Sequence, residues 1–155
     1  MSLIRLQDSD NDGISDQAEI GTFSTDPNIA DADGDNLTDG EELLLFQTDP
    51  SIADSDNDNF LDGDEVIAGT DPNNPLSKLE ISAIELRDDG SSQIQWESVT
   101  GRTYRIFRST NLQSNEWGTP IGTTNGDGTL QNFVDNNLPN SSNVFYRLEV
   151  EQNAL

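Results

Sequence analysis

The chain of 155 residues carries 30 acidic and 7 basic side chains, which gives a formal net charge of −23. This balance argues against binding to nucleic acid or to an anionic membrane surface, both of which need basic patches, and it favours a cation as the partner. Cysteine and histidine are both missing from the sequence, which excludes disulfides, thiolate zinc sites and the commonest general base, and leaves oxygen ligands of the kind that suit hard cations.

The negative charge is concentrated in the first half of the chain. Residues 1–75 hold 20 acids and one base, whereas residues 76–155 hold 10 acids and 6 bases. A shift this sharp predicts two units, which we place at residues 1–77 and 78–155. No stretch is long and apolar enough to cross a bilayer and no signal peptide is visible, so we expect no membrane insertion.

The first half contains one acidic loop three times. Residues 8–19 read DSDNDGISDQAE, residues 31–42 read DADGDNLTDGEE and residues 54–65 read DSDNDNFLDGDE, so the copies start 23 residues apart. A fixed period of about this length indicates a repeat array. Two carboxylates about 4 Å apart repel each other by roughly 4 kcal/mol at an intermediate effective dielectric constant, so this crowding calls for a compensating charge.

The spacing D-x-D-x-D-G-x-x-D-x-x-E matches a twelve-residue calcium loop. Positions 1, 3 and 5 of such a loop offer side-chain oxygens, position 7 a backbone carbonyl, position 9 a contact often made through water, and position 12 a bidentate glutamate. The predicted ligands are Asp8, Asp10, Asp12, Ile14, Asp16 and Glu19; Asp31, Asp33, Asp35, Leu37, Asp39 and Glu42; and Asp54, Asp56, Asp58, Phe60, Asp62 and Glu65. We expect about three Ca²⁺ ions rather than Mg²⁺, because six or more oxygens make a roomy cage.

A solvated acidic face is the alternative interpretation, and acidic enrichment with few aromatic residues also fits disorder of the first half without metal. Six ligand positions kept in register three times favour the metal site. Position 6 is Gly13 in the first copy but Asn36 and Asn59 in the others. Asparagine tolerates positive φ, so we expect slightly strained but intact loops.

A short helix is predicted after each loop, starting near Asp16, Asp39 and Asp62 as capping residues and ending near Phe23, Gln47 and Gly69, before Thr-Asp-Pro turns. Pro27 and Pro50 argue against an entering helix, so the copies are loop-then-helix rather than complete EF-hands. Apolar side chains recur at fixed positions, and we expect this ladder to stack into a core: Ile14, Leu37, Phe60, Ile20, Leu43, Val66, Phe23 and Phe46.

The stretches D-x-D-x-D-G-I-S-D, G-E-E-L-L-L and A-G-T-D-P-N-N-P resemble the bacterial form of the thrombospondin type 3 repeat over about residues 8–75. The resemblance implies a compact, calcium-wrapped repeat in a secreted or surface protein, often a spacer beside other modules. The sequence departs from it at Asn36 and Asn59, and it lacks the cysteines of the animal form. The dockerin module is a second resemblance, which fits less well because dockerins have two copies separated by a linker.

From about residue 79 the apolar pattern alternates, as is typical of strands separated by turn residues. We predict strands near 79–86, 92–98, 103–109, 117–123, 129–135 and 144–151. Strands of this length and spacing predict an antiparallel β-sandwich. The predicted fold class is therefore mixed, with two domains: tandem calcium loop-plus-short-helix repeats followed by an antiparallel β-sandwich.

The segments WESVTGRTYRIFRS and VFYRLEV resemble fibronectin type III or related immunoglobulin-like modules over about residues 79–151. The resemblance implies that Trp96 is the core tryptophan and that Tyr104 and Tyr146 point inward. Alternation places three other aromatic residues less well and leaves a carbohydrate or partner patch open: Phe107, Trp117 and Phe145. The arginines are expected to balance charge on the outward faces: Arg102, Arg105, Arg108 and Arg147.

We do not expect an enzyme, because no Ser/His/Asp or Cys/His set is possible and the acids left over, such as Glu85, Glu97 and Glu116, show no paired spacing. Two functions stay open. One is a calcium-stabilised structural spacer of adhesion type with a terminal β-module; the other is a recognition module that binds a protein or a polysaccharide through the β-domain or the repeat helices. EF-hand-like loops of this incomplete kind suit the millimolar calcium outside cells, which predicts a secreted or cell-surface protein of a bacterium.

Overall fold

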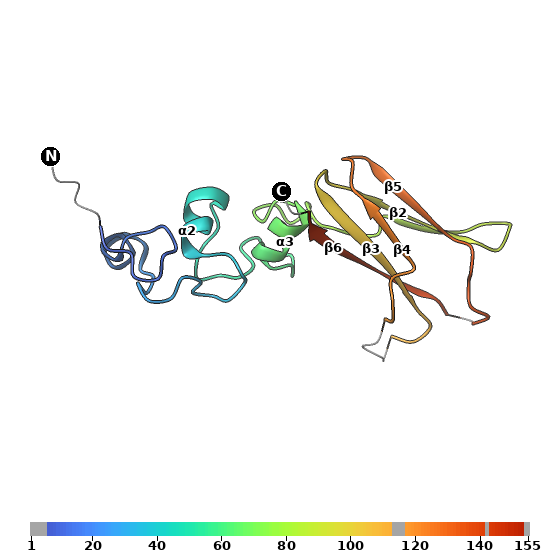
Figure 1. The fold of residues 1–155 in the computed structure, drawn as a ribbon, viewed down its shortest axis with the longest axis horizontal. Coiled ribbons are helices and arrows are strands. Elements are labelled where there is room, and N and C mark those ends of the chain that lie inside the picture. The colour runs from blue at the N-terminus through green and yellow to red at the C-terminus, as the bar shows by residue number, and fades with distance from the viewer. Residues whose placement is uncertain (1–5, 113–116, 142, 154–155) are drawn as a thin grey trace. The chain divides into compact units, whose positions relative to one another are not determined.

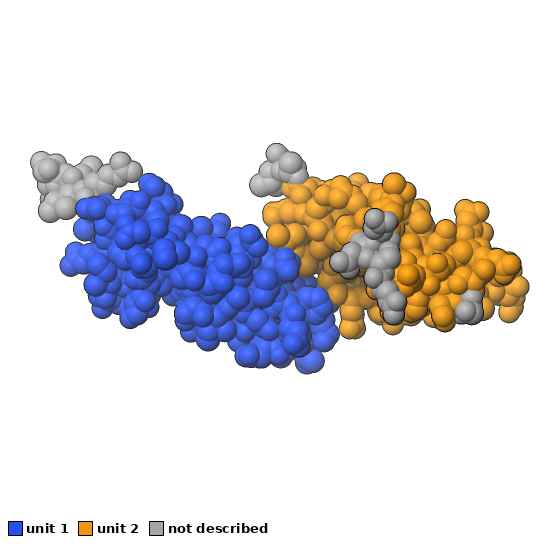
Figure 2. Space-filling view, turned by 90° about the horizontal axis from the view of Figure 1, so that it is seen from below, with its two compact units in different colours: residues 1–66, 70–78 blue, residues 67–69, 79–155 orange. Residues whose placement is uncertain are grey.

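The computed structural model describes residues 6–112, 117–141 and 143–153. The chain divides into two compact units, coloured separately in Figure 2: residues 1–66 with 70–78 form unit 1, and residues 67–69 with 79–155 form unit 2. Within the described ranges, no helix has the length and apolar character needed to span a bilayer.

Unit 1 consists of three loops, each followed by a short helical segment (Figure 1). The segments are α1 (Asp16–Ala18) continued by the π-helical turn η1 (Glu19–Phe23), α2 (Asp39–Glu41) continued by η2 (Glu42–Phe46), and α3 (Asp62–Ala68). They begin at the three predicted aspartates. The first two end in a left-handed residue, Ser24 and Gln47, directly before the Thr-Asp-Pro turns.

The residues that cap the first two helices precede the predicted aspartates. The Ser15 hydroxyl accepts a hydrogen bond from the Ala18 amide at 3.4 Å. Thr38 forms a capping box with Glu41, in which each side chain accepts from the other residue's backbone amide, at 3.2 and 3.0 Å. Serine and threonine oxygens satisfy free amides in this position. The prediction that Asp16 and Asp39 are the caps is therefore wrong by one residue, and these carboxylates are available for other contacts.

The sixth position of each loop has the left-handed backbone that the sequence predicts. Gly13 has φ of 100°, Asn36 of 80° and Asn59 of 76°. Asparagine is among the few residues that enter this region at modest cost. The substitution of asparagine for glycine is thus compatible with the turn in the second and third copies.

The apolar ladder does not build the interior of unit 1. Ile14 and Leu37 are buried, but Ile20 is 71% exposed and Phe60 41% exposed. The fully buried large side chains of this unit are carboxylates instead: Glu19, Asp35, Asp39, Glu42 and Asp62. Charged groups occupy the space that a hydrocarbon core would fill, so the expected stacking of the whole ladder is wrong.

Unit 2 consists of two three-stranded antiparallel sheets (Figure 1). The strands are β1 (Ala83–Leu86), β2 (Ser92–Glu97), β3 (Arg102–Ser109), β4 (Gly122–Asn125), β5 (Leu130–Asp135) and β6 (Phe145–Gln152). One sheet has the order β1-β2-β5 and the other the order β4-β3-β6. In the second sheet Tyr104 pairs with Val150 and Ile106 with Leu148.

Four predicted strands match closely and two differ. β1 begins at Ala83 instead of residue 79, although Leu79 and Ile81 still pack against the core. β4 begins at Gly122, where the sequence predicts a strand from 117. Pro120 has no amide to donate and Gly118 has φ of 70°, so the stretch before β4 is unsuited to a ladder.

The core of unit 2 draws on both sheets. Ile94 and Trp96 of β2 and Tyr104 and Ile106 of β3 are fully buried and form one cluster. The Trp96 and Tyr104 rings lie 5.8 Å apart, and the Tyr104 hydroxyl accepts the Val99 amide hydrogen at 2.8 Å. Tyr146, Leu148 and Val150 of β6 pack against this cluster, as their alternation predicts.

Arginines cover part of the outer surface of unit 2. Arg105 pairs with Glu151 at 2.8 Å and Arg108 with the buried Asp135 at 2.7 Å. The Arg147 guanidinium lies over two rings, those of Phe107 and Trp117, at 4.9 Å from each centroid. A face of each ring is thus stacked against this cation, which leaves less aromatic surface for a sugar.

Candidate metal centres

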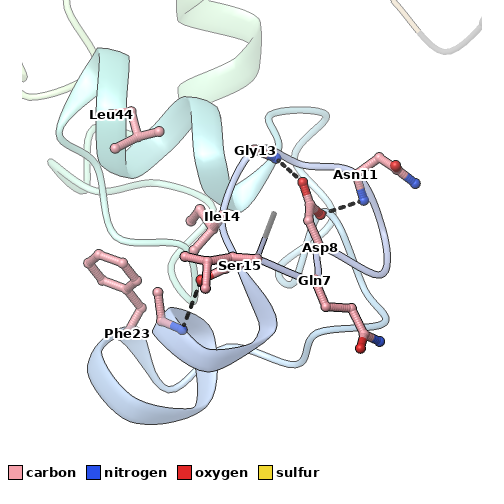
Figure 3. Close-up of a pocket in the computed structure, with 10 residues that line it drawn as sticks. Gln7, Asp8, Asn11, Gly13, Ile14, Ser15, Phe23 and Leu44 are labelled. Carbon is pink, nitrogen blue, oxygen red and sulfur yellow. Dashed lines mark hydrogen bonds between the residues drawn. The ribbon is translucent and has the colours of Figure 1, made fainter. Parts of the chain in front are cut away.

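The first loop folds around the carboxylate of Asp8 (Figure 3). Its two oxygens accept hydrogen bonds from the amides of Asn11 at 2.8 Å and Gly13 at 3.3 Å. The Asp12 carboxylate accepts the Ile14 amide hydrogen at 2.7 Å. An aspartate that binds the backbone a few residues further on bends the chain into a tight loop. The spacing of the acids therefore determines the local turn as well as the charge.

The same pattern recurs in the other two loops. Asp31 accepts from the amides of Gly34 and Asn36 at 2.7 and 3.2 Å. Asp54 accepts from the amides of Asp58 and Asn59 at 3.2 and 2.9 Å. At the fifth position, Asp35 accepts from Leu37 at 2.8 Å and Asp58 from Phe60 at 2.9 Å. All three loops thus share the hydrogen bond from the sixth residue to the first aspartate and the one from the seventh residue to the fifth, whereas the third loop uses the amide of its fifth residue where the others use that of the fourth.

The aspartates at positions 1, 3 and 5 converge in every copy. In each of three triplets the carboxylates offer oxygens that all lie within 4.8 Å of one another: Asp8, Asp10 and Asp12; Asp31, Asp33 and Asp35; Asp54, Asp56 and Asp58. Such a separation allows one ion to contact all three side chains. Hard divalent cations take oxygen ligands of this kind.

The glutamates at position 12 are held in place by threonines. The hydroxyls of Thr25, Thr48 and Thr70 donate to one carboxylate oxygen of Glu19, Glu42 and Glu65, at 3.3, 3.1 and 3.0 Å. Glu19 and Glu42 are fully buried and Glu65 is 2% exposed. The sequence pattern predicted only turns for the Thr-Asp-Pro triplets. In the three copies in turn, threonine follows the glutamate by six, six and five residues. This recurrence is the feature of the sequence that could have predicted the hydrogen bond from threonine to glutamate.

Unpartnered oxygens lie at the predicted ligand positions. Among the described residues, all buried carboxylate oxygens without a hydrogen-bond partner belong to predicted ligands: Asp10, Glu19, Asp33, Asp39, Glu42, Asp56, Asp58, Asp62 and Glu65. A buried polar atom without a partner costs about 1–3 kcal/mol, and more when it is charged. A cation satisfies such oxygens, so the residues fit a metal ion of the predicted kind.

Burial and mutual repulsion make these acids hard to ionise without a cation. Burial raises the pKa of Glu42 to about 8 and the pKa of Glu65 to about 7, and nearby aspartates add to both shifts. Burial, together with the charge of Asp35, raises the pKa of Asp33 to about 6. The pKa values of Glu19 and Asp39 are raised for the same reasons. A bound divalent cation would reverse this preference by favouring the charged form.

Consecutive repeats contact each other at position 9. Asp39 of the second repeat lies with Asp12 and Glu19 of the first, again with oxygens within 4.8 Å. The neighbouring Gly40 amide donates to Asp12 at 3.0 Å, and the Gly63 amide donates to Asp35 at 2.7 Å. The twelve-residue ligand pattern assigns no role to either glycine. Their presence in the second and third copies, where the first copy has Gln17, was the available signal.

The remaining predicted ligands are placed as follows. The Asp16 carboxylate accepts hydrogen bonds from the amide and the hydroxyl of Ser9, each at 2.9 Å. The side chains of Ile14 and Leu37 are buried, whereas that of Phe60 is 41% exposed. The role of these three backbone carbonyls as ligands stays a prediction.

Comparisons with known proteins address unit 1 most directly. The family model of the bacterial TSP3 repeat, a calcium-binding repeat, matches residues 8–30, 31–51 and 54–75. No curated protein matches the chain. A solved structure named "Biofilm associated protein - BSP domain" is similar with 22% identity and a TM-score of 0.35, covering 79% of this chain.

This chain spans 22% of the length of that solved chain. The family match falls on the three loops whose geometry is described above. Over residues 8–75 the chain therefore matches three consecutive copies of the calcium-binding bacterial TSP3 repeat.

Proposed function

We propose that unit 1 binds about three Ca²⁺ ions, one per loop, and acts as a calcium-rigidified spacer of an extracellular bacterial protein. The observation that carries this proposal is the set of unpartnered buried carboxylate oxygens, all at predicted ligand positions. The triplets of converging aspartates and the family match at the same residues support it. The chain's own residues supply the carboxylates, and the threonine hydroxyls orient the glutamates.

Electrostatics explains why the fold needs the ions. Residues 1–75 carry 20 acids and one base, and several of these acids are fully buried. A cation that binds only the folded form stabilises it by RT ln(1 + [L]/Kd), about 2.7 kcal/mol at a hundredfold excess over Kd for each site. Three such sites give a stabilisation comparable to the ~5–15 kcal/mol that holds an ordinary domain together.

For unit 2 we propose an immunoglobulin-like or fibronectin type III-like β-sandwich without catalytic function. The shared core of residues from β2 and β3, which belong to different sheets, supports the sandwich. Its buried aromatic residues serve packing, and Arg147 lies over the rings of Phe107 and Trp117. We assign unit 2 the role of a folded module beside the repeats.

Recognition of a protein through the repeat helices is a second candidate function. Ile20 is 71% exposed, Leu44 64% and Leu45 65%, all on the helical segments of unit 1. Exposed apolar side chains on neighbouring elements are typical of surfaces that bind a partner. A polysaccharide partner has less support, because Arg147 covers one face of Phe107 and of Trp117, two of the three aromatic residues open to such a ligand.

Chelation tests the calcium proposal. We expect native mass spectrometry in calcium to give about three bound ions. Titration with EDTA at about pH 9, where the buried acids are ionised, should remove the helical circular dichroism of unit 1, while tryptophan fluorescence stays unchanged because both tryptophans, Trp96 and Trp117, lie in unit 2. A helical signal that persists after complete removal of metal would contradict the proposal.

A further inference from the structure

We infer that the position-9 aspartates Asp39 and Asp62 bind the cation of the preceding repeat, so that each of these repeats supplies a ligand to its neighbour's metal site. The inference rests on the proposed function, because it assigns ligands to the calcium ions proposed there. In the standard loop, position 9 serves its own ion, often through water. The two assignments differ in which repeat loses its ion when the aspartate is changed.

The first contact between repeats joins Asp39 of the second repeat to the metal ligands of the first. Asp39 is fully buried. One of its oxygens accepts the Ala32 amide hydrogen of its own loop at 2.9 Å, and the other has no hydrogen-bond partner. Asp39 shares a 4.8 Å cluster with Asp12 and Glu19, the fifth and twelfth ligand positions of the first repeat.

Gly40 brings the second helix against the first loop. Its amide donates to the Asp12 carboxylate at 3.0 Å, and a Cβ atom at this residue would lie 2.1 Å from the Asp12 carbonyl oxygen. Only glycine permits this approach without a shift of the backbone. The contact therefore places the beginning of α2, and Asp39 with it, at the first metal centre.

The second contact shares the hydrogen bonds and the burial of the first, whereas the 4.8 Å cluster of carboxylate oxygens is found at the first. Asp62 is fully buried, one oxygen accepts the Ser55 amide hydrogen at 2.9 Å, and the other is unpartnered. The Gly63 amide donates to Asp35 at 2.7 Å, and a Cβ on Gly63 would lie 2.3 Å from the Asp35 carbonyl oxygen. Two independent copies of the contact thus share their hydrogen bonds and their unpartnered oxygen.

At the two ends of the array, the residues equivalent to those of the contacts lack a partner repeat within the described ranges. Asp16 has no preceding repeat within the described residues, and Ser9 occupies both of its oxygens; the next residue is Gln17, which is not a glycine. At the other end, one oxygen of Asp58 is unpartnered. The equivalent oxygens of Asp12 and Asp35 accept the glycine amides of the following repeat.

The test compares Asp39→Asn with Asp16→Asn, the same change at the same loop position in the first repeat. Asparagine keeps the oxygen that accepts the Ala32 amide and removes the charged oxygen. Hydrogen exchange measured by mass spectrometry across a calcium titration gives a separate midpoint for residues 8–19 and residues 31–42. We expect Asp39→Asn to raise the calcium midpoint of residues 8–19 by about tenfold or more, and that of residues 31–42 less.

Asp16→Asn should leave the midpoint of residues 31–42 unchanged, because no second repeat lies at its carboxylate. If Asp39→Asn fails to fold, Asp62→Asn gives the same test one repeat later, with an expected shift in residues 31–42 rather than 54–65. A shift of the calcium midpoint confined to the substituted repeat contradicts the assignment of its aspartate to the preceding ion, but does not contradict calcium binding itself. Wild-type protein without calcium-dependent protection or bound ions in native mass spectrometry overturns the proposed function itself.

Discussion

Replacing Gly40 with alanine should destabilise the calcium-loaded repeats. The added Cβ would lie 2.1 Å from the backbone carbonyl oxygen of Asp12, where ordinary contact begins at 3.4 Å. A backbone atom cannot rotate away as a flexible side chain can, so α2 and the first loop must separate. This movement also stretches the 3.0 Å hydrogen bond from the Gly40 amide to the Asp12 carboxylate.

The magnitude follows from three contributions. Overpacking in a tight site costs about 1–3 kcal/mol, and the loss of a hydrogen bond to a charged group costs about 1.5–3 kcal/mol. Alanine gains up to ~1 kcal/mol over glycine through helix propensity. The free energy of unfolding of unit 1 should therefore fall by about 1.5–5 kcal/mol.

Gly21→Ala is the matched control. Gly21 lies in the helical turn of the first repeat, and a Cβ there meets nothing within 4 Å. This change should stabilise unit 1 by about 0.5–1 kcal/mol, because glycine has the larger entropy in the unfolded chain. Urea denaturation in saturating calcium, followed by far-ultraviolet circular dichroism, measures both variants. Midpoints that move in the same direction would refute the close approach of α2 to the first loop.

Two further predictions concern pH and the core of unit 2. Without metal, the pKa values of Glu42 (about 8), Glu65 (about 7) and Asp33 (about 6) are raised in the folded protein. Protonation of these acids therefore stabilises the fold fully below the pKa values that they have in the unfolded chain. This stabilisation is lost as the pH rises from about 6 to about 8. Circular dichroism without metal should therefore show more helix at about pH 5 than at about pH 9. In calcium the order should reverse, because the ion binds deprotonated carboxylates. Equal signals at both pH values without metal would show that these acids are not buried as described. Tyr104→Phe removes the hydroxyl that accepts the Val99 amide at 2.8 Å and should lower the stability of unit 2 by about 1–3 kcal/mol in urea denaturation followed by tryptophan fluorescence. An unchanged midpoint for Tyr104→Phe would show that the hydrogen bond does not contribute.

Local spacing in the sequence predicted the features that a single repeat determines. The loops, the helix starts at Asp16, Asp39 and Asp62, and the left-handed Asn36 and Asn59 depend on neighbours within a few residues. The buried face of β2 and β3 was equally readable, because alternation with period two places Trp96 and Tyr104 on the core side.

Contacts between repeats could not be predicted in the same way. The position of Asp39 beside Asp12 depends on how one repeat turns relative to the next, which no pattern within one loop specifies. The apolar ladder was misinterpreted because periodic isoleucine and leucine residues usually form a core. Here the interior is filled by acids such as Glu42, and Ile20 stays exposed while its equivalents Leu43 and Val66 are only half-buried.

An interior of carboxylate oxygens changes how unit 1 responds to heat. Burial of hydrocarbon produces the large heat-capacity change of ordinary unfolding and its curved temperature dependence. Glu19, Asp35, Asp39, Glu42 and Asp62 bury polar atoms instead, and exposure of polar atoms has the opposite sign. We therefore expect a flatter stability curve for unit 1 than for a domain of the same size with a hydrocarbon core, so that ion concentration affects its folding more than temperature does.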